Sequence, residues 1–165
     1  MTADRRFWQL NLRHAATATL LVIDWARQDD DAALAAAVAG RLSNPNNELP
    51  PSILVSIAVK IAEDLLRSRL DADEFDRWLD SVFAPTGATL AATDLVRAAR
   101  VADDMDAFRA VIEGALRGYG GIHCVIEACN CLRNTVAFAY HGQPVAVLES
   151  WASMVAGKVL SGEFA

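Results

Sequence analysis

The chain has 165 residues, of which 53% are hydrophobic and 22% charged, and this length suffices to bury a core, so we expect one domain spanning residues 1–165. Its 21 acidic residues outnumber its 15 basic ones, for a formal net charge of -6, which disfavours nucleic acid and anionic membranes as main partners. The longest apolar run near the N-terminus, Ala15 to Ile23, falls short of the ~20 residues that a membrane-spanning helix needs.

The cysteines and the basic residues indicate where the protein works. The chain has three cysteines, an odd number, and all lie between Cys124 and Cys131, which argues against an extracellular disulfide framework. Reduced thiols are typical of a cytoplasm. Nearly all the basic residues are arginine, the exceptions being Lys60 and Lys158, and with the abundant alanine this is typical of a high-GC bacterial genome. We expect a cytoplasmic bacterial protein.

Apolar residues recur at helical spacing along almost the whole chain, which predicts an all-α bundle of about seven or eight helices. The clearest loop is residues 43–51, where proline and asparagine both interrupt a helix. The predicted helices span residues 4–28, 29–42, 50–70, 71–83, 89–101, 103–118, from there to 140, and 145–160.

Acidic residues gather where three of these helices begin, at residues 29–31, 71–76 and 103–106. Carboxylates at a helix start accept hydrogen bonds from free backbone N–H groups and interact favourably with the helix dipole, so we interpret these residues as caps. The last two clusters could alternatively face each other and hold magnesium and a diphosphate, as in helical prenyl-transfer enzymes. That chemistry needs a much longer chain to build its cavity, which favours capping.

The helix predicted over residues 50–70 carries two ion pairs with i,i+4 spacing, Lys60 with Asp64 and Glu63 with Arg67, which we expect on the surface. β-Branched residues at its start leave a strand over residues 53–59 as an alternative, but the apolar period favours a helix. In the two helices that follow, the same period predicts inward-facing aromatic and aliphatic side chains, among them Trp78 and Leu90.

Similar segments recur at a spacing of about thirty residues, within the range of paired-helix repeats of the tetratricopeptide kind. Residues 65–67 (Leu-Leu-Arg) precede 73–75 (Asp-Glu-Phe), and residues 95–97 (Leu-Val-Arg) precede 106–108 (Asp-Ala-Phe). A third copy, from Leu132, lacks the acid and the aromatic residue, and the other copies lack the glycine and tyrosine of that motif. We therefore expect antiparallel helical hairpins with weak repeat character and assign no family.

A polar stripe interrupts the otherwise apolar helix predicted over residues 118–140. On a helical wheel its five members fall on one side, opposite a broad apolar face. Imidazole, carboxylate and thiolate groups are transition-metal ligands, so the stripe is a candidate pocket or metal site; the alternative is the solvated face of an amphipathic helix. The stripe consists of His123, Glu127, Asn130, Cys131 and Asn134.

Further ligands would have to come from another element. His14 is the sixth candidate, because it lies within the apolar face of the first predicted helix and could be a buried ligand or base; such a histidine is more often a hydrogen-bonded part of the core. The cysteine spacing differs from the C-x-x-C pattern of zinc sites, so the sequence predicts no metal and no cofactor.

Two hypotheses of function remain. The first is a non-enzymatic interaction or regulatory module that binds a protein partner or a second copy of itself, which the apolar content and the absence of a catalytic signature favour. The second is a bundle that binds a small molecule or a metal, with or without catalysis, through His14 and the residues of the polar stripe. Alanine substitution of His123 and Glu127 separates them, because only the second predicts a loss of ligand binding.

Overall fold

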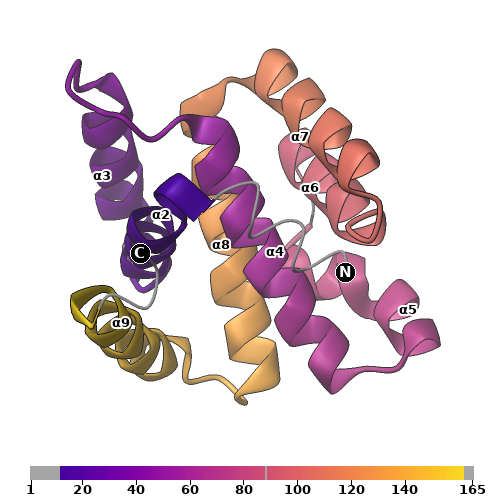
Figure 1. Cartoon of the computed structure of the whole chain (residues 1–165). Coiled ribbons are helices and arrows are strands. Elements are labelled where there is room, and N and C mark those ends of the chain that lie inside the picture. Colours follow the sequence, from indigo (N-terminus) through magenta and orange to yellow (C-terminus); the bar gives the residue numbers. More distant parts are fainter. Residues whose placement is uncertain (1–11, 88, 162–165) are drawn as a thin grey trace.

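The computed structural model confirms the all-α fold. It describes residues 12–87 and 89–161, and within these residues it contains eight helices and no strand. The side chains of residues 12–14 and 159 also lie outside the description, as does the part of the first predicted helix before residue 12. The helices are α2 (Leu12–Ala26), α3 (Asp31–Ser43), α4 (Pro51–Arg69), α5 (Ala72–Phe83), α6 (Leu90–Arg100), α7 (Met105–Tyr119), α8 (Gly121–Ala139) and α9 (Pro144–Leu160) (Figure 1).

The acidic residues at helix starts act as caps, as predicted. Asp30 accepts a hydrogen bond from the Ala32 backbone N–H at 2.8 Å, and Asp104 caps α7 in the same way. Asp71 and Glu74 form a reciprocal capping box at the start of α5. The bond from the Glu74 backbone N–H holds the pKa of the Asp71 carboxyl below its usual range.

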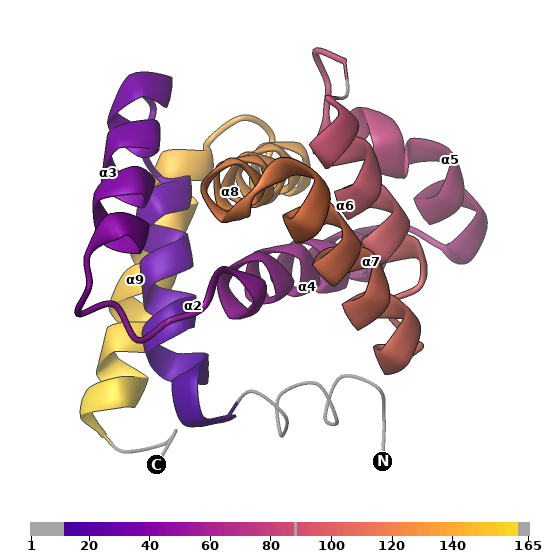
Figure 2. The same ribbon diagram turned by 90° about the horizontal axis from the view of Figure 1, so that it is seen from above.

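Two helices of 19 residues each, α4 and α8, cross at the centre of the molecule. Helices α2, α3 and α9 lie on one side of this pair, and α5, α6 and α7 lie on the other (Figures 1 and 2). Helix α8 contacts all the helices of both groups, and α4 contacts α2 on one side and α5, α6 and α7 on the other. The two central helices thus join the two groups, and the thirty-residue repeat is not confirmed.

The first residues of α4 and α8 approach each other closely. A Cβ atom on Gly121 would lie 2.7 Å from Cγ of Pro51, which is closer than carbon atoms tolerate. Glycine at this position therefore allows the two central helices to meet. The preceding Gly120 has a φ of 84°, a conformation that other residues rarely adopt, and it turns the chain from α7 into α8.

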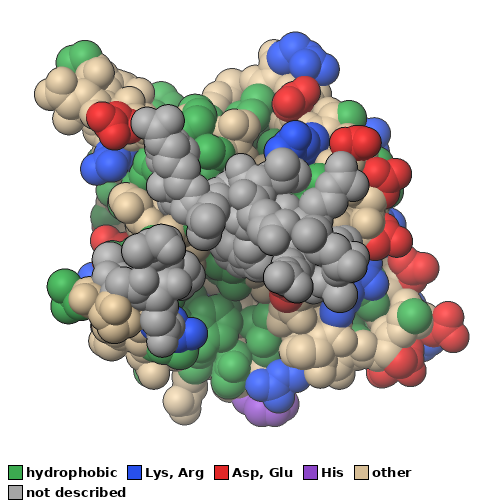
Figure 3. Space-filling view, in the orientation of Figure 1, with side chains coloured by type: hydrophobic (Ala, Val, Ile, Leu, Met, Phe, Trp, Pro, Cys, Tyr) green, Lys and Arg blue, Asp and Glu red, His purple; other side chains and the backbone are tan. Residues whose placement is uncertain are grey.

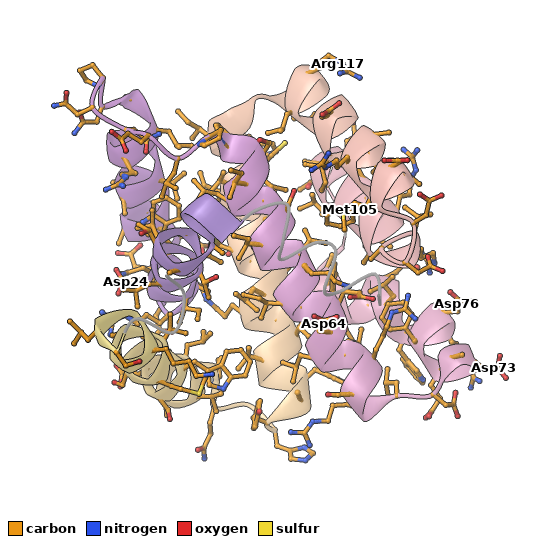
Figure 4. The ribbon with its side chains drawn as sticks, viewed as in Figure 1. Asp24, Asp64, Asp73, Asp76, Met105 and Arg117 are labelled. Atoms are coloured by element: carbon orange, nitrogen blue, oxygen red, sulfur yellow. The ribbon has the colours of Figure 1, made fainter. Side chains whose placement is uncertain are left out.

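The central position of α4 changes the environment of its charged residues. Lys60 and Glu63 are 2% and 3% exposed, so the prediction that their ion pairs lie on the surface is wrong for these two side chains. A helix at the centre of a bundle is covered over most of its circumference, so some of its polar residues are enclosed with the apolar ones. Figure 4 places Asp64 on this central helix and Asp73 at the outer edge of the molecule, on α5.

Two apolar residues that we expected in the core are on the surface. Trp78 of α5 is 47% exposed, because it lies at the margin of a face whose centre is formed by Phe75 and Leu79. Leu90 is 73% exposed because it is the first residue of α6, where the helix begins outside the packed region. Acidic and basic side chains are mixed along the side of the molecule where α5 and α7 lie (Figure 3).

Candidate functional site: a polar pocket on α8

A pocket of about 280 Å³ lies over the polar stripe of α8. Helix α8 runs between α3 on one side and α5 and α6 on the other (Figure 2), and all four helices contribute to the walls. Glu127, Asn130 and Asn134 line the pocket from α8, so three of the five stripe residues meet in one hollow. The other polar residues of the walls are Asp31, Thr86, Thr89 and Arg133.

Hydrogen bonds to neighbouring helices hold two wall residues in place. Asn134 Nδ2 donates to the Phe83 backbone oxygen at 2.9 Å, which attaches α8 to the end of α5. Arg133 Nε donates to the Ala26 backbone oxygen at 2.8 Å, and its Nη2 donates to that of Gln28. These carbonyl groups lie at the end of α2 and lack partners within that helix, so Arg133 caps α2 while it forms the pocket wall.

Glu127 and Asn130 differ from these two residues. Both side chains are half-buried, and within residues 12–87 and 89–161 neither makes a hydrogen bond or an ion pair. A carboxylate and an amide beside a hollow, without protein partners, remain available to solvent or to a ligand. Glu127, Asn130 and the Thr86 hydroxyl are the side-chain groups of the pocket that make no hydrogen bond or ion pair within the described residues.

Two further polar groups of the wall, those of Asp31 and Thr89, are partly engaged. Asp31 Oδ1 lies 3.8 Å from Arg133 Nη1, and its side chain is 91% exposed, so water screens this pair. The Thr89 hydroxyl oxygen accepts a hydrogen bond from the Ala92 backbone N–H at 3.1 Å, which leaves its own O–H group free to donate. The pocket therefore combines one unpaired carboxylate with several neutral hydrogen-bonding groups.

Two of the predicted site residues, His123 and Cys131, lie outside the pocket. His123 is exposed and does not line the pocket, and the side chain of His14 lies outside the described part of the structure. Cys131 is 1% exposed, so its placement on a polar face was wrong. Neighbouring helices cover more than half of the α8 circumference, and they enclose this position as well.

This enclosure keeps the thiols protonated and unreactive. Burial raises the pKa of Cys124 and Cys131, and it raises the pKa of Cys129 to about 12. A buried protonated thiol is neither a good metal ligand nor a nucleophile. No group of three or more histidine, cysteine, aspartate or glutamate side chains in the described part of the chain is arranged to hold a metal ion.

Four polar wall residues were not among the predicted site residues. Arg133 follows Asn130 at i,i+3 spacing, and this spacing was a usable signal that it borders the stripe. Asp31, Thr86 and Thr89 come from other elements, and no pattern in the chain connects them to α8. Their position depends on how α3 and the α5–α6 loop pack, which helical periodicity leaves open.

A second hollow, of about 320 Å³, lies between α2 and α3, but its chemistry is less specific. Leu20 and Leu21 contribute much of its lining, and its acidic residue, Asp24, is paired with Arg27 at 2.6 Å. No unpaired carboxylate comparable to Glu127 faces it among the described residues. Although it is larger, it offers less to a polar ligand, so the pocket on α8 is the better candidate.

Comparison with known proteins identifies no relative: no family model, no curated protein and no solved structure matches the chain. Within the described residues, no helix is both long enough and apolar enough to cross a bilayer. A functional conclusion therefore depends on the residues of the pocket and on the surface of the molecule.

Proposed function

We propose that the protein binds a small polar ligand in the pocket on α8. The observation that supports this function is the pair of unpartnered side chains, Glu127 and Asn130, which face a hollow with walls from several helices. A solvated helix face would explain the polar residues but not the enclosing walls. A pocket over the stripe accounts for both the polar residues and the walls.

The pocket is suited to binding rather than to catalysis. Hydrogen bonds from Arg133 and Asn134 to neighbouring helices fix its walls before a ligand arrives, and fixed walls lower the entropic cost of binding. A general acid and a general base acting as a pair would need a second titratable group beside Glu127. Asp31 is largely exposed and Cys131 does not reach the pocket. The volume, near the lower end of the ~300–1,000 Å³ of ligand pockets, restricts the ligand to a small molecule or one side chain.

A screen of small polar fragments by protein NMR tests this proposal. We expect amide shifts at Thr86, Glu127 and Asn130 for at least one chemical class of fragment. The double variant E127A/N130A should lose this response. The matched control is Glu113→Ala on α7, which removes an exposed carboxylate away from the pocket. Fragment binding that survives the double variant, or a screen without any response in the pocket, would refute the proposal.

An interaction module is the second candidate, and exposed aromatic side chains favour it. Trp78 of α5 is 47% exposed and Phe138 of α8 is 42% exposed, and these two helices contact each other. Exposed aromatic groups on neighbouring helices are frequent at protein interfaces. We propose a second copy of this chain as the partner to test first.

Sedimentation velocity over a range of protein concentrations measures this self-association. If Trp78 and Phe138 form an interface, W78S/F138S should shift the protein toward the monomer. Met154→Ser, which removes an exposed side chain on α9, should not. A monomer at every concentration would exclude the second copy as partner.

The three free cysteines further support a reducing bacterial cytoplasm as the location that we propose.

A further inference from the structure

We infer that the ligand of the pocket on α8 carries a positively charged ammonium or guanidinium group. This inference rests on the proposed binding function and names the chemical class of the ligand. Its basis is the balance of charge and of hydrogen-bond acceptors in the pocket, where Glu127 supplies a carboxylate without a protein partner.

The positive charge in the wall is already used. Arg133 donates to the backbone oxygens of Ala26 and Gln28 and lies 3.8 Å from the Asp31 carboxylate. The C-terminal end of a helix carries a partial negative charge, so the two backbone contacts partly offset the guanidinium. No ion pair joins Arg133 to Glu127 within the described residues, and with Asp31 and Glu127 against Arg133 the pocket keeps one excess negative charge.

The neutral groups add hydrogen-bond acceptors. Asn134 uses its Nδ2 on the Phe83 backbone oxygen, and its Oδ1 has no partner within the described residues. Asn130 is without a partner and can turn its amide oxygen toward a donor. The end of α5, which forms another part of the wall, is the negative pole of that helix. One carboxylate and two amide oxygens match the three N–H donors of an ammonium group.

An anionic ligand is disfavoured by the same features. It would meet the Glu127 carboxylate, and the two helix starts beside the pocket are already capped, that of α3 by Asp30 and that of α6 by Thr89. A cationic group has two sources, a free small amine or the side chain of a lysine or arginine on another protein. The small volume admits either, and their shared chemistry is what the pocket recognises.

Three probes of similar size and different charge test this inference: butylammonium, butanol and butyrate, each titrated against the protein and followed by NMR shifts in the pocket. We expect butylammonium to bind at least about tenfold more tightly than butanol, and butyrate to bind most weakly. Added salt should weaken butylammonium binding and leave butanol unchanged.

Two substitutions in the pocket and one outside it identify the group responsible. Glu127→Gln keeps the side-chain shape and should lower butylammonium affinity about tenfold. Asn130→Asp adds a second carboxylate and should raise it. Glu113→Gln on α7 is the control and should change nothing. Circular dichroism confirms that each variant is folded, and the gain in Asn130→Asp distinguishes a lost charge from a damaged pocket.

The outcomes separate the two proposals. If butanol or butyrate binds in the pocket as tightly as butylammonium, the charge inference is wrong while the binding function stands. If neither these probes nor the fragment screen shifts any pocket residue, both fail. A lysine-containing peptide that binds more tightly than butylammonium, through the same Glu127 dependence, identifies a protein as the source of the cation. Weaker binding of the peptide identifies a free amine.

Discussion

The two central helices, α4 and α8, have equal length and similar surroundings, but their charged residues lie in opposite environments. On α4, Lys60 Nζ lies 2.9 Å from Glu63 Oε2, Glu63 also accepts a hydrogen bond from Arg67, and both Lys60 and Glu63 are almost completely buried. On α8, Glu127 has no partner within the described residues and lies beside a pocket.

The difference teaches how pairing decides burial. A carboxylate loses much hydration energy when it is enclosed, and only a nearby cation with good geometry offsets that loss. Glu63 has two such cations and can be enclosed by the bundle. Glu127 has none, so its side of α8 stays open to solvent. A cationic ligand beside Glu127 would give α8 the kind of ion pair that Glu63 already makes on α4.

The largest expected effect is on the stability of Glu63 variants. Glu63→Gln removes the charge between Lys60 and Arg67, and we expect a loss of about 2–4 kcal/mol in the free energy of unfolding. Lys60 retains Asp64 at 3.2 Å, which keeps the loss below that of an isolated buried cation. Glu127→Gln, the matched change on α8, should alter stability by less than about 0.5 kcal/mol. Urea denaturation of both variants measures the difference.

Equal effects of the two glutamate substitutions would contradict the comparison. A large loss for Glu127→Gln would mean that its carboxylate is paired and unavailable to a ligand. A negligible loss for Glu63→Gln would mean that the buried pair on α4 contributes no stability beyond its own cost of desolvation, as is observed for some buried ion pairs.

The contact between the starts of α4 and α8 gives the next largest effect. Gly121→Ala places a methyl group 2.7 Å from the Pro51 ring, so the helices must separate, and we expect a loss of about 1–3 kcal/mol. Gly118→Ala is the control: no atom lies within 4 Å of its added Cβ, and alanine should stabilise α7 by about 0.5–1 kcal/mol. Opposite signs in thermal denaturation confirm the close approach; a neutral Gly121→Ala would show that the helices can move apart freely.

The buried Cys129 thiol on α8 predicts that the free energy of unfolding falls at alkaline pH. Below a pH of about 9, thiols are protonated in the folded and unfolded states alike and contribute no difference. Between about 9 and about 12, the unfolded chain loses the Cys129 proton while the folded protein retains it, so the free energy of unfolding falls by up to ~1.4 kcal/mol per pH unit. Urea denaturation at increasing pH should show a shallower fall for Cys129→Ala. An identical slope in this variant would mean that Cys129 ionises in the folded protein.

Periodicity was sufficient to predict the helices but not the site. Helical spacing and caps located the ends of α3 to α9 to within about three residues, since the signals for both lie within each segment. The same wheel placed Cys131 among polar residues and Lys60 at the surface, because a wheel assumes one buried side and central helices are enclosed on several. The residues of the other pocket walls come from α3 and the α5–α6 loop. Only tertiary packing brings them together, so no local pattern could predict them.

The smallest expected change in the free energy of unfolding concerns the C-terminal ends of the two central helices. Helix α4 ends at Leu70 in an extended conformation, whereas α8 ends in a left-handed turn, with a φ of 55° at His141 and a bond of 2.8 Å from the Gly142 N–H to the Ala137 oxygen. Glycine would relieve about 1–2 kcal/mol of strain at position 141 but adds unfolded-state entropy of about 0.5–1 kcal/mol.

His141→Gly should therefore raise the free energy of unfolding by about 0.5–1 kcal/mol. His141→Ala keeps the Cβ atom and the strain, and should leave stability within about 0.5 kcal/mol of the original protein. If urea denaturation shows a loss for both variants, the imidazole itself stabilises the turn. If it shows a gain for both, the imidazole is unfavourable there and backbone strain is not the cause. A gain for glycine alone assigns the strain to the backbone at the end of α8, for which α4 has no counterpart.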